Sequence, residues 1–439
     1  MKLVATSKVL CFIVAMGLLL SIFFTLTSAH AQFVQTHDGQ LTLNEQAYHF
    51  LGTNFWYGMN LGSTGKSGDR QRLRQELNHL QRLGVLNLRV LALSEGPENA
   101  PWRLQPANQQ SPGTLSENLL QGLDFLLNEM SKRQMKAVVV LNNFWPWSGG
   151  MAQYQSWTTK TTIPYPPPEP GGRWDLFQNY TSSFYANTQA NMLFQKAIAT
   201  IITRKNTITK NTYLNDPTIM SWELANEPRG GMHPQELNVW IHETAQFIKS
   251  LDPHHLVTVG SEGLTPYPST NNDFYKNHAS KYIDYTTIHI WPTNWNWFDP
   301  QRADATIQIA LQKTKAYLLQ HLSMSEKMER PMVLEEFGFP RDKESYSPTS
   351  STYYRNLFYE EIFKFVYQLA EKRKSMAGIN FWAWSGEGRP LENKMYWAAG
   401  DSFTGDPPHE RQGWYSVYST DTKTHNILRA YTKLISELQ

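Results

Sequence analysis

Short apolar runs alternate along this chain with longer segments whose apolar residues recur at helical spacing. The short runs are rich in β-branched and aromatic residues and predict buried strands, and the longer segments predict amphipathic helices. The predicted strands are 50–55, 86–92, 137–143, 219–227, 256–261, 285–290, 331–337 and 377–384. The predicted helices are 70–83, 115–133, 191–204, 236–251, 303–322 and 353–373. Alternation of this kind is typical of helices that cross between parallel strands.

Eight such units predict an α/β fold, a (β/α)8 TIM barrel in a single domain, whose site lies at the carboxyl ends of the strands. An open, doubly wound sheet is the alternative. Its Gly-x-Gly-x-x-Gly turn is missing after the first strand, since Gly58, Gly62, Gly65 and Gly68 have another spacing. Extra length lies in two predicted strand-end loops, 148–189 and 387–413. The first contains the proline-rich stretch 164–172, which we expect to form a wall of a cleft without regular structure.

Residues 1–31 are typical of a secretory signal peptide. Lys2 and Lys8 precede a long apolar run, and Ala29-His30-Ala31 is a small-x-small cleavage site. We therefore expect a secreted catalytic domain of residues 32–439, extracellular or periplasmic, although an uncleaved segment of this length would anchor the protein in a membrane. Removing both lysines from the 40 basic residues balances the 38 acidic ones. A neutral surface disfavours nucleic acid or an anionic membrane as partner and suits an uncharged polymer.

Two of the predicted strands end in glutamate. The strand at 219–227 ends in Asn226-Glu227-Pro228, and the strand at 331–337 contains Glu335 and Glu336 directly before Phe337-Gly338. Two carboxylates at the ends of different strands are typical of a retaining glycosidase, in which one group donates a proton and the other is the nucleophile. Because neighbouring strand residues face opposite sides, only one of Glu335 and Glu336 is expected to face a sugar.

The surrounding motifs resemble glycoside hydrolase family 5, in its endo-β-1,4-mannanase branch. They are Trp222-Glu-Leu-Ala-Asn-Glu-Pro-Arg229, Asn142-Asn-Phe-Trp145, His289-Ile-Trp-Pro292 and Phe381-Trp-Ala-Trp384, and they extend over most of the chain in this order. The resemblance implies that Glu227 is the general acid/base. It also selects Glu336 as the nucleophile, because the family's nucleophile directly precedes an aromatic residue and glycine.

The same resemblance assigns further residues to the site. Asn226 would bind the 2-hydroxyl of the cleaved sugar, and Arg89 would lie beneath the nucleophile and keep it ionised. His289 would line the site. The sequence departs from the family pattern at Trp291, where a tyrosine usually contacts the nucleophile. An indole can donate a hydrogen bond but cannot accept one, so Trp291 is either a platform for sugar or an orienting residue.

Fifteen tryptophans suit a polysaccharide, because the apolar faces of pyranose rings stack on flat aromatic rings. Trp382 matches the tryptophan that forms the floor of the subsite for the cleaved sugar in the family. Asn143 and Glu262 are expected as polar lining. Other tryptophans at or beyond predicted strand ends are candidates for the groove or for the core: Trp56, Trp145, Trp147, Trp291, Trp295, Trp297 and Trp384.

No cofactor or metal is expected, because the histidines show no ligand spacing and His233, His254 and His255 are interpreted as loop or surface residues. The sequence thus predicts a monomeric, secreted endo-acting mannanase that acts on mannan, galactomannan or glucomannan with no obligate protein partner. A β-1,4-glucanase on the same scaffold is the alternative enzyme. A non-catalytic glycan-binding protein is the alternative from another class, and it is disfavoured because both glutamates are present.

Overall fold

The computed structural model describes residues 33–438, which belong to one compact unit of the chain. The expected signal peptide lies outside the described residues. Within the described range, no helix is long and apolar enough to cross a membrane.

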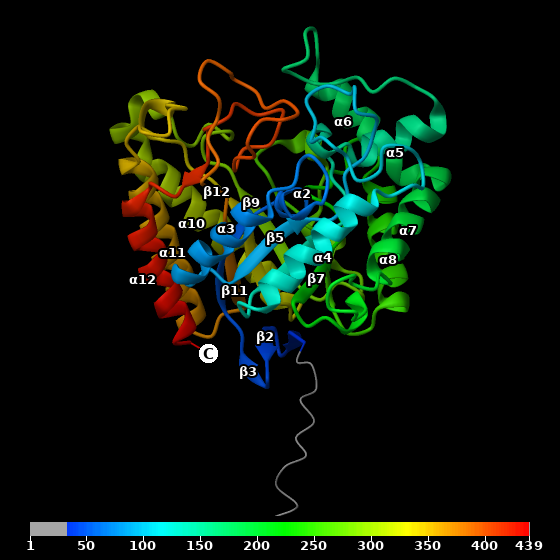
Figure 1. The fold of residues 1–439 in the computed structure, drawn as a ribbon. Coiled ribbons are helices and arrows are strands. Elements are labelled where there is room, and N and C mark those ends of the chain that lie inside the picture. Colours follow the sequence, from blue (N-terminus) through cyan, green and yellow to red (C-terminus); the bar gives the residue numbers. More distant parts are fainter. Residues whose placement is uncertain (1–32, 439) are drawn as a thin grey trace, which may run out of the picture. The chain divides into compact units, whose positions relative to one another are not determined.

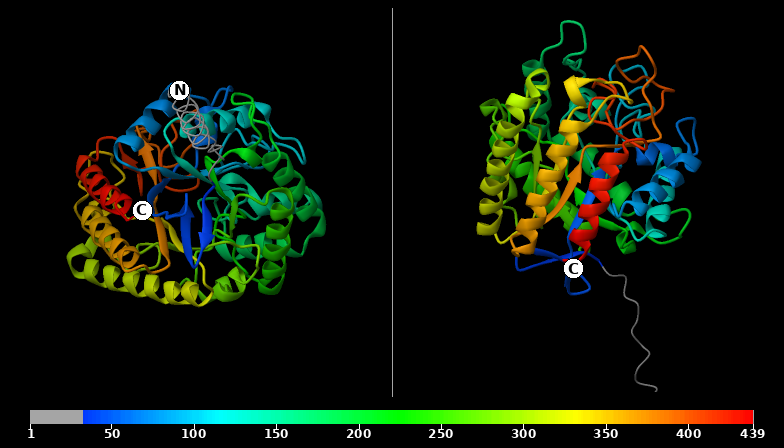
Figure 2. Two further views of the ribbon diagram at one scale, coloured as in Figure 1. Left: turned by 90° about the horizontal axis from the view of Figure 1, so that it is seen from below. Right: turned by 90° about the vertical axis from the view of Figure 1, so that its left-hand side faces the viewer.

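Eight parallel strands form the central sheet (Figure 1). They are β4 (Phe50–Asn54), β5 (Asn87–Leu91), β6 (Lys136–Val140), β7 (Ile219–Glu223), β8 (Leu256–Thr258), β9 (Thr286–Ile290), β10 (Met332–Phe337) and β11 (Met376–Phe381). Their order is β8-β7-β6-β5-β4-β11-β10-β9, so chain neighbours pair, except β8 and β9 at the two ends of the sheet, and β11 returns to β4. The view along the strands shows them inside a ring of helices (Figure 2). The sheet is therefore nearly closed, and the predicted (β/α)8 barrel is confirmed.

The strands are buried on both faces, which explains their nearly continuous apolar sequences. In β6, for example, Ala137 to Val140 are all buried. The outer helices place their apolar faces against this barrel. They are α3 (Arg70–Arg82), α4 (Glu117–Ser131), α7 (Thr188–Ile202), α8 (Pro234–Leu251), α10 (Ala303–Lys327), α11 (Tyr353–Glu371) and α12 (Thr422–Ser436).

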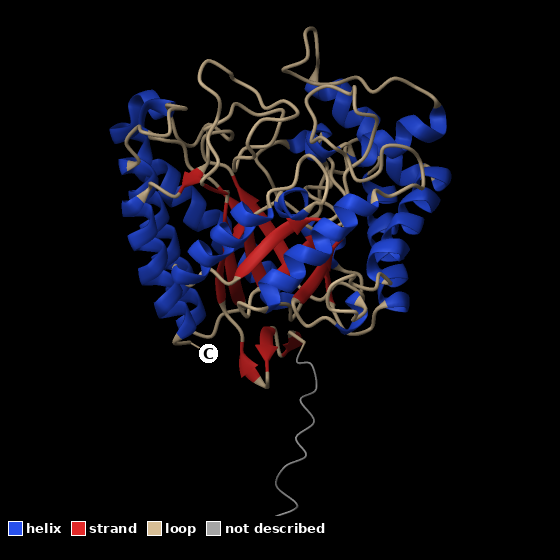
Figure 3. Ribbon diagram, viewed as in Figure 1, coloured by secondary structure: helices blue, strands red, loops and turns tan. Residues whose placement is uncertain are grey.

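The two long loops lie together at the carboxyl ends of the strands, where Figure 3 shows most of the irregular backbone. The first is more helical than predicted, because α5 (Gly150–Thr159) and α6 (Trp174–Ser182) lie within it. The sequence of α5 has no clear apolar stripe, and α6 is short, so neither gives a strong periodic signal. The stretch 164–172 has no helix or strand, as predicted.

Three short strands near the start of the described residues are among the elements that were not predicted from the sequence pattern. The strands β1 (Gln35–His37), β2 (Gln40–Leu43) and β3 (Gln46–Ala47) form a small antiparallel sheet. This sheet lies at the end of the barrel opposite the long loops (Figure 1). Each strand has fewer than five residues, too few for a periodic pattern to be distinguished.

Candidate active site

Glu227 follows β7 in a left-handed backbone conformation, with φ at 52°. This conformation is uncommon for a residue with a side chain and is frequent at functional sites. Backbone hydrogen bonds to the neighbouring strand ends hold it in place. The amide of Glu227 donates to the carbonyl of Gly260 at 2.9 Å, and the amide of Asn226 donates to the carbonyl of Asn142 at 2.9 Å. The strand end therefore turns the Glu227 side chain into the mouth of the barrel.

Glu336 lies on β10, next to an irregularity in the pairing with β9. The register shifts between Leu334 and Glu336, so that Glu336 pairs with His289. A bulge re-aims side chains, and simple alternation fails here. Glu336 lines the cleft, whereas Glu335 lies deeper, with Oε2 3.7 Å from both Arg89 Nε and His289 Nε2. Both carboxylates thus approach the same cations, and only Glu336 faces the cleft.

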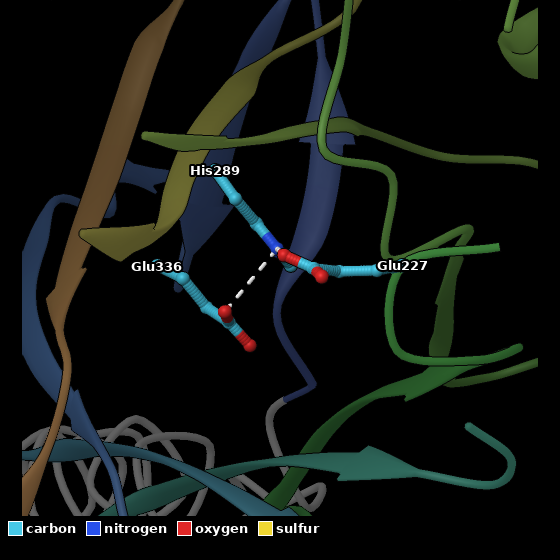
Figure 4. A group of neighbouring side chains, drawn as sticks. All are labelled: Glu227, His289 and Glu336. Carbon is cyan, nitrogen blue, oxygen red and sulfur yellow. Dashed lines mark hydrogen bonds and ion pairs between the residues drawn. The ribbon is translucent and has the colours of Figure 1, made fainter. Parts of the chain in front are cut away.

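His289 lies between the two glutamates (Figure 4). Its Nδ1 is 2.6 Å from Glu227 Oε1 and 3.3 Å from Glu336 Oε2. One carboxylate oxygen of Glu227, one of Glu336 and a ring nitrogen of His289 all lie within 4.8 Å of one another. The structure therefore brings together the two glutamates that the sequence singled out, with one histidine as a bridge.

Arg89 lies beneath the nucleophile candidate and is almost fully buried. Its guanidinium forms an ion pair with Glu336 and pairs in two-point fashion with Glu223. It also donates to Asn54 Oδ1 at 3.0 Å and to Asn226 Oδ1 at 2.9 Å. A buried arginine with this many partners fixes the positions of all of them. Glu223 was not predicted as part of the site, although its place at the end of a strand in the Trp-Glu-Leu-Ala motif is a usable signal.

The pKa values of the two glutamates move in opposite directions. Burial raises the pKa of Glu336 to about 7, against the opposing effect of His289 and Arg89. Burial also acts to raise the pKa of Glu227, but the hydrogen bond and charge of His289 outweigh it and lower this pKa to about 2. The neighbouring carboxylates in turn raise the pKa of His289 to about 10, despite its burial.

The pair of carboxylates consequently titrates together and holds a single proton between about pH 2 and pH 7. Burial favours the protonated form of Glu336, and the contacts of Glu227 favour its ionised form, whereas the sequence-based expectation places the proton on Glu227. The reason is that His289 and two indoles already donate to Glu227. His289 Nδ1 lies close to both carboxylates.

Glu227, His289 and Glu336 are also a group whose ligand atoms could hold a metal ion. The close pairing of His289 with Glu227 and the ion pair of Arg89 with Glu336 already occupy these groups.

A cleft of about 660 Å³ opens above the two glutamates. Trp145, Trp291, Trp382 and Glu262, which are candidates from the sequence, line it. Trp291 replaces the usual tyrosine and lies near the acid/base candidate, with Nε1 3.4 Å from Glu227 Oε1. Gly338 allows this placement, because a Cβ there would lie 2.6 Å from the Trp291 ring.

The expected cleft lining needs correction at Asn143 and Trp56. Asn143 is fully buried and does not line the cleft; its amide donates to Ser148 Oγ and accepts from Asn226. Trp56 is buried below the cleft, and its indole donates to the Gly405 carbonyl at 2.9 Å. The side-chain polar atoms of both residues are hydrogen bonded to other parts of the protein. We therefore interpret both residues as structural support for the site.

The other tryptophans from the sequence analysis also fall into two groups, those that line the cleft and those that do not. Trp147 and Trp295 line the cleft, whereas Trp297 does not. Trp384 is fully buried and donates to Glu76 at 2.9 Å. His255 lies in the loop before β8, as interpreted, but it is fully buried and not at the surface, and its Nδ1 lies 2.6 Å from Asp252 Oδ2.

Sequence reasoning missed much of the outer cleft. Its remaining lining comes mainly from the long loops and from β-to-α connections: Pro167, Pro168, Trp174, Gln178, Arg229, Tyr267, Ser269, Asn294, Tyr396, Pro407, His409, Glu410, Arg411, Trp414 and Tyr415. Arg229 belongs to the Asn-Glu-Pro-Arg motif and was visible there. The loop residues carry no pattern, because their place depends on how the loops fold over the barrel.

A barrel with two close glutamates at its strand ends, below a cleft rich in aromatic residues, defines the class of glycosidases that work with paired carboxylates. Residues 31–439 match the sequence family described as "GH family 5 beta-mannosidase-like". The chain therefore belongs to glycoside hydrolase family 5 and is a glycoside hydrolase.

Its relatives carry related names. Mannan endo-1,4-beta-mannosidase 5 of Solanum lycopersicum is 31% identical over 376 residues, which is 82% of each chain. The glycoside hydrolase family 5 mannosidase of Rhizomucor miehei is 37% identical, with a TM-score of 0.86 over 94% of this chain and 99% of that one. The endo-1,4-beta-mannanase of the same organism is 23% identical, with a TM-score of 0.65 over 92% of this chain and 99% of that one. The last likeness shows the fold alone.

Proposed function

We propose that this enzyme hydrolyses β-1,4-linked mannan, galactomannan or glucomannan from within the chain and with retention of configuration. The observation that carries the proposal is the closeness of Glu227 and Glu336, whose nearest ligand oxygens lie within 4.8 Å. Retaining glycosidases hold their two carboxyl groups about 5 to 5.5 Å apart, whereas inverting enzymes need about 6.5 to 9.5 Å to admit a water molecule. The observed spacing supports the double displacement.

In the first step, Glu336 attacks the anomeric carbon while Glu227 protonates the departing glycosidic oxygen. A covalent ester between the sugar and Glu336 results. In the second step, Glu227 takes a proton from water, whose oxygen displaces Glu336 from the sugar. Arg89 supports the ionised form of Glu336, and the single proton of the pair has to lie on Glu227 once substrate is bound.

The substrate assignment rests on the relatives. The tomato relative named above and one from Arabidopsis thaliana, at 28% identity over 88% of this chain, are both called mannan endo-1,4-beta-mannosidases. The tryptophans that line the cleft suit stacking on sugar rings. We further propose that the enzyme is exported as a monomer after cleavage near Ala31, which the N-terminal sequence and solution mass of the exported protein would test.

An exo-acting or short-chain mannosidase is a second candidate. The more similar solved relative is called a mannosidase, and a variant of it has been solved in complex with mannosyl-fructose. The present cleft, at about 660 Å³, falls in the range of sites that enclose a small ligand. Residues of both long loops, such as Pro168 and Glu410, line it and limit its extent.

One experiment separates these functions. Purified protein is incubated with mannan, galactomannan, glucomannan and carboxymethylcellulose, and both reducing ends and viscosity are followed. Endo-mannanase activity should release reducing ends from the three mannans, with an early fall in viscosity. Release of mannose without that fall would favour the exo-acting enzyme. Preference for carboxymethylcellulose would indicate a glucanase, and no release from any polymer would favour a glycan-binding protein.

A further inference from the structure

The two oxygens of Glu227 have different surroundings. Oε1 lies near His289 Nδ1 at 2.6 Å and accepts a long hydrogen bond from Trp291 Nε1 at 3.4 Å. Oε2 accepts from Trp145 Nε1 at 2.5 Å. Within residues 33–438, Trp145 is the one hydrogen-bond donor to Oε2. The orientation of this carboxylate about its terminal bond therefore depends on an indole N–H.

Trp145 is itself held on two sides. Its backbone amide donates to Asn143 Oδ1 at 3.0 Å, and Asn143 also accepts from the Asn226 amide at 3.1 Å. The face of its ring is covered by the Arg229 guanidinium, 4.5 Å from the ring centroid. Arg229 pairs in two-point fashion with Glu262 at 2.6 and 2.7 Å.

Direct side-chain contacts link four residues in series, from Glu262 through Arg229 and Trp145 to Glu227. Glu262 and Arg229 are buried, and a two-point pair between such groups has a fixed geometry. A guanidinium over an aromatic face is an attractive contact that holds the ring plane. The series therefore restrains the indole, and the indole restrains the carboxylate.

From these contacts we infer that Trp145 is a positioning residue for the acid/base Glu227, and that the Arg229–Glu262 pair acts on the reaction through Trp145. This inference rests on the proposed function. Because an indole only donates, it stabilises the Glu227 carboxylate that forms when the leaving sugar takes the proton. The rival view is that Trp145 is only a stacking platform for a sugar in the cleft, which it also lines.

Trp145→Phe separates the two roles, because phenylalanine keeps an aromatic face for sugar and for Arg229 but lacks the N–H. The positioning role predicts a roughly ten- to hundredfold lower kcat on mannan, since the lost bond is one to a charged group. KM should change less than about twofold. A mannoside whose leaving group needs no protonation should lose much less of its glycosylation rate. A raised KM with unchanged kcat would overturn the inference in favour of the platform.

The pH profile gives a second measure that a platform would not move. Without the donor, the proton of the carboxylate pair is held more tightly, so the alkaline limb of kcat/KM should move to higher pH by about one pH unit. Trp240→Phe is the matched control: Trp240 is buried on α8 among Phe184, Tyr185 and Phe194, and its Nε1 has no hydrogen-bond partner among residues 33–438. It should leave the profile unchanged. An unmoved limb in folded Trp145→Phe would contradict the positioning role.

Arg229→Lys tests the rest of the series, because lysine keeps the charge and loses the planar fork. Alone it should lower kcat and move the alkaline limb in the same direction by a smaller amount. Combined with Trp145→Phe it should add little further loss, since its effect passes through the missing N–H. Fully additive losses would overturn this step. If Trp145→Phe does not fold, an unmoved limb in folded Arg229→Lys overturns the inference.

Failure of the proposed function has a different signature. If the unmodified enzyme does not cleave mannan, the proposed function falls. If it does cleave mannan and the Trp145→Phe profile matches it in kcat and pH dependence, only the positioning role falls.

Discussion

Replacing Arg89 by methionine should move the pH profile of the enzyme toward higher pH. Arg89 pairs with Glu336 and Glu223 and donates to Asn54 and Asn226, all within the barrel. Methionine fills much of the same space without charge. The variant leaves the buried carboxylates with His289 as their nearest cation, and an uncompensated buried carboxylate gains protons more readily.

The size of the change follows from the separation of the charges. Two unit charges about 4 Å apart interact by about 4 kcal/mol at an effective dielectric constant of about 20, and one pKa unit corresponds to about 1.4 kcal/mol. Losing Arg89 should therefore raise the pKa values of the carboxylate pair by roughly one to three pH units, with relaxation reducing the full effect. Breaking a buried ion pair should also lower the free energy of unfolding by about 3 to 5 kcal/mol.

The assay is kcat/KM against pH with an aryl mannoside, together with circular dichroism and a denaturation curve. At pH values below the acid limb, kcat/KM should fall about tenfold for every pH unit by which the midpoint of that limb rises. Arg89→Lys is the matched control, because it keeps the charge; its limbs should stay within about half a pH unit of those of the unmodified enzyme even if its turnover falls. Unmoved limbs in folded Arg89→Met would refute the role of Arg89 in keeping Glu336 ionised.

Three further predictions concern other parts of the site. Glu227→Gln should retain its glycosylation rate on mannosides of acidic phenols far better than on mannan, because such leaving groups need no protonation; equal losses on both substrates would remove Glu227 from the acid role. Trp382→Ala should lower kcat by at least roughly tenfold, since Trp382 lines the cleft beside Trp291 and stacking adds to the lost contact area; a defect confined to KM or to folding would argue against it. The free energy of unfolding should decline as pH rises from about 6.5 to 10, because His289, with its pKa raised to about 10, holds its proton in the native protein but not in the unfolded chain. Urea denaturation at several pH values should show a shallower decline in His289→Gln.

The barrel could be predicted because its signal is periodic and repeated. All eight strands of the sheet fall within or overlap the predicted runs, from Phe50–Asn54 to Met376–Phe381. Because these strands are buried on both faces, their sequences are nearly continuous apolar runs, which can be recognised in a single sequence. Helix α5 in the first long loop has no such recognisable pattern, since its packing depends on elements distant in the sequence.

The inner site could be predicted because strand ends meet at one face of a barrel, so Glu227, His289 and Glu336 had to approach one another. The directions of individual side chains could not be predicted. The register shift beside Glu336 brings Glu335 toward Arg89 as well, against simple alternation. Asn143 was expected to line the cleft but serves as support, because a residue type shows which hydrogen bonds are possible and not which partner is near.

The most direct test of the central claim is covalent trapping with a 2-deoxy-2-fluoro-mannoside that carries an activated leaving group. The fluorine slows both displacements and the activated leaving group restores the first, so the sugar ester should accumulate on the enzyme. Mass spectrometry of the digested protein should then find one fluorosugar on Glu336, and the trapped enzyme should regain activity as the ester hydrolyses. A label on Glu335, or inverted product from an enzyme that cannot be labelled, would contradict the account.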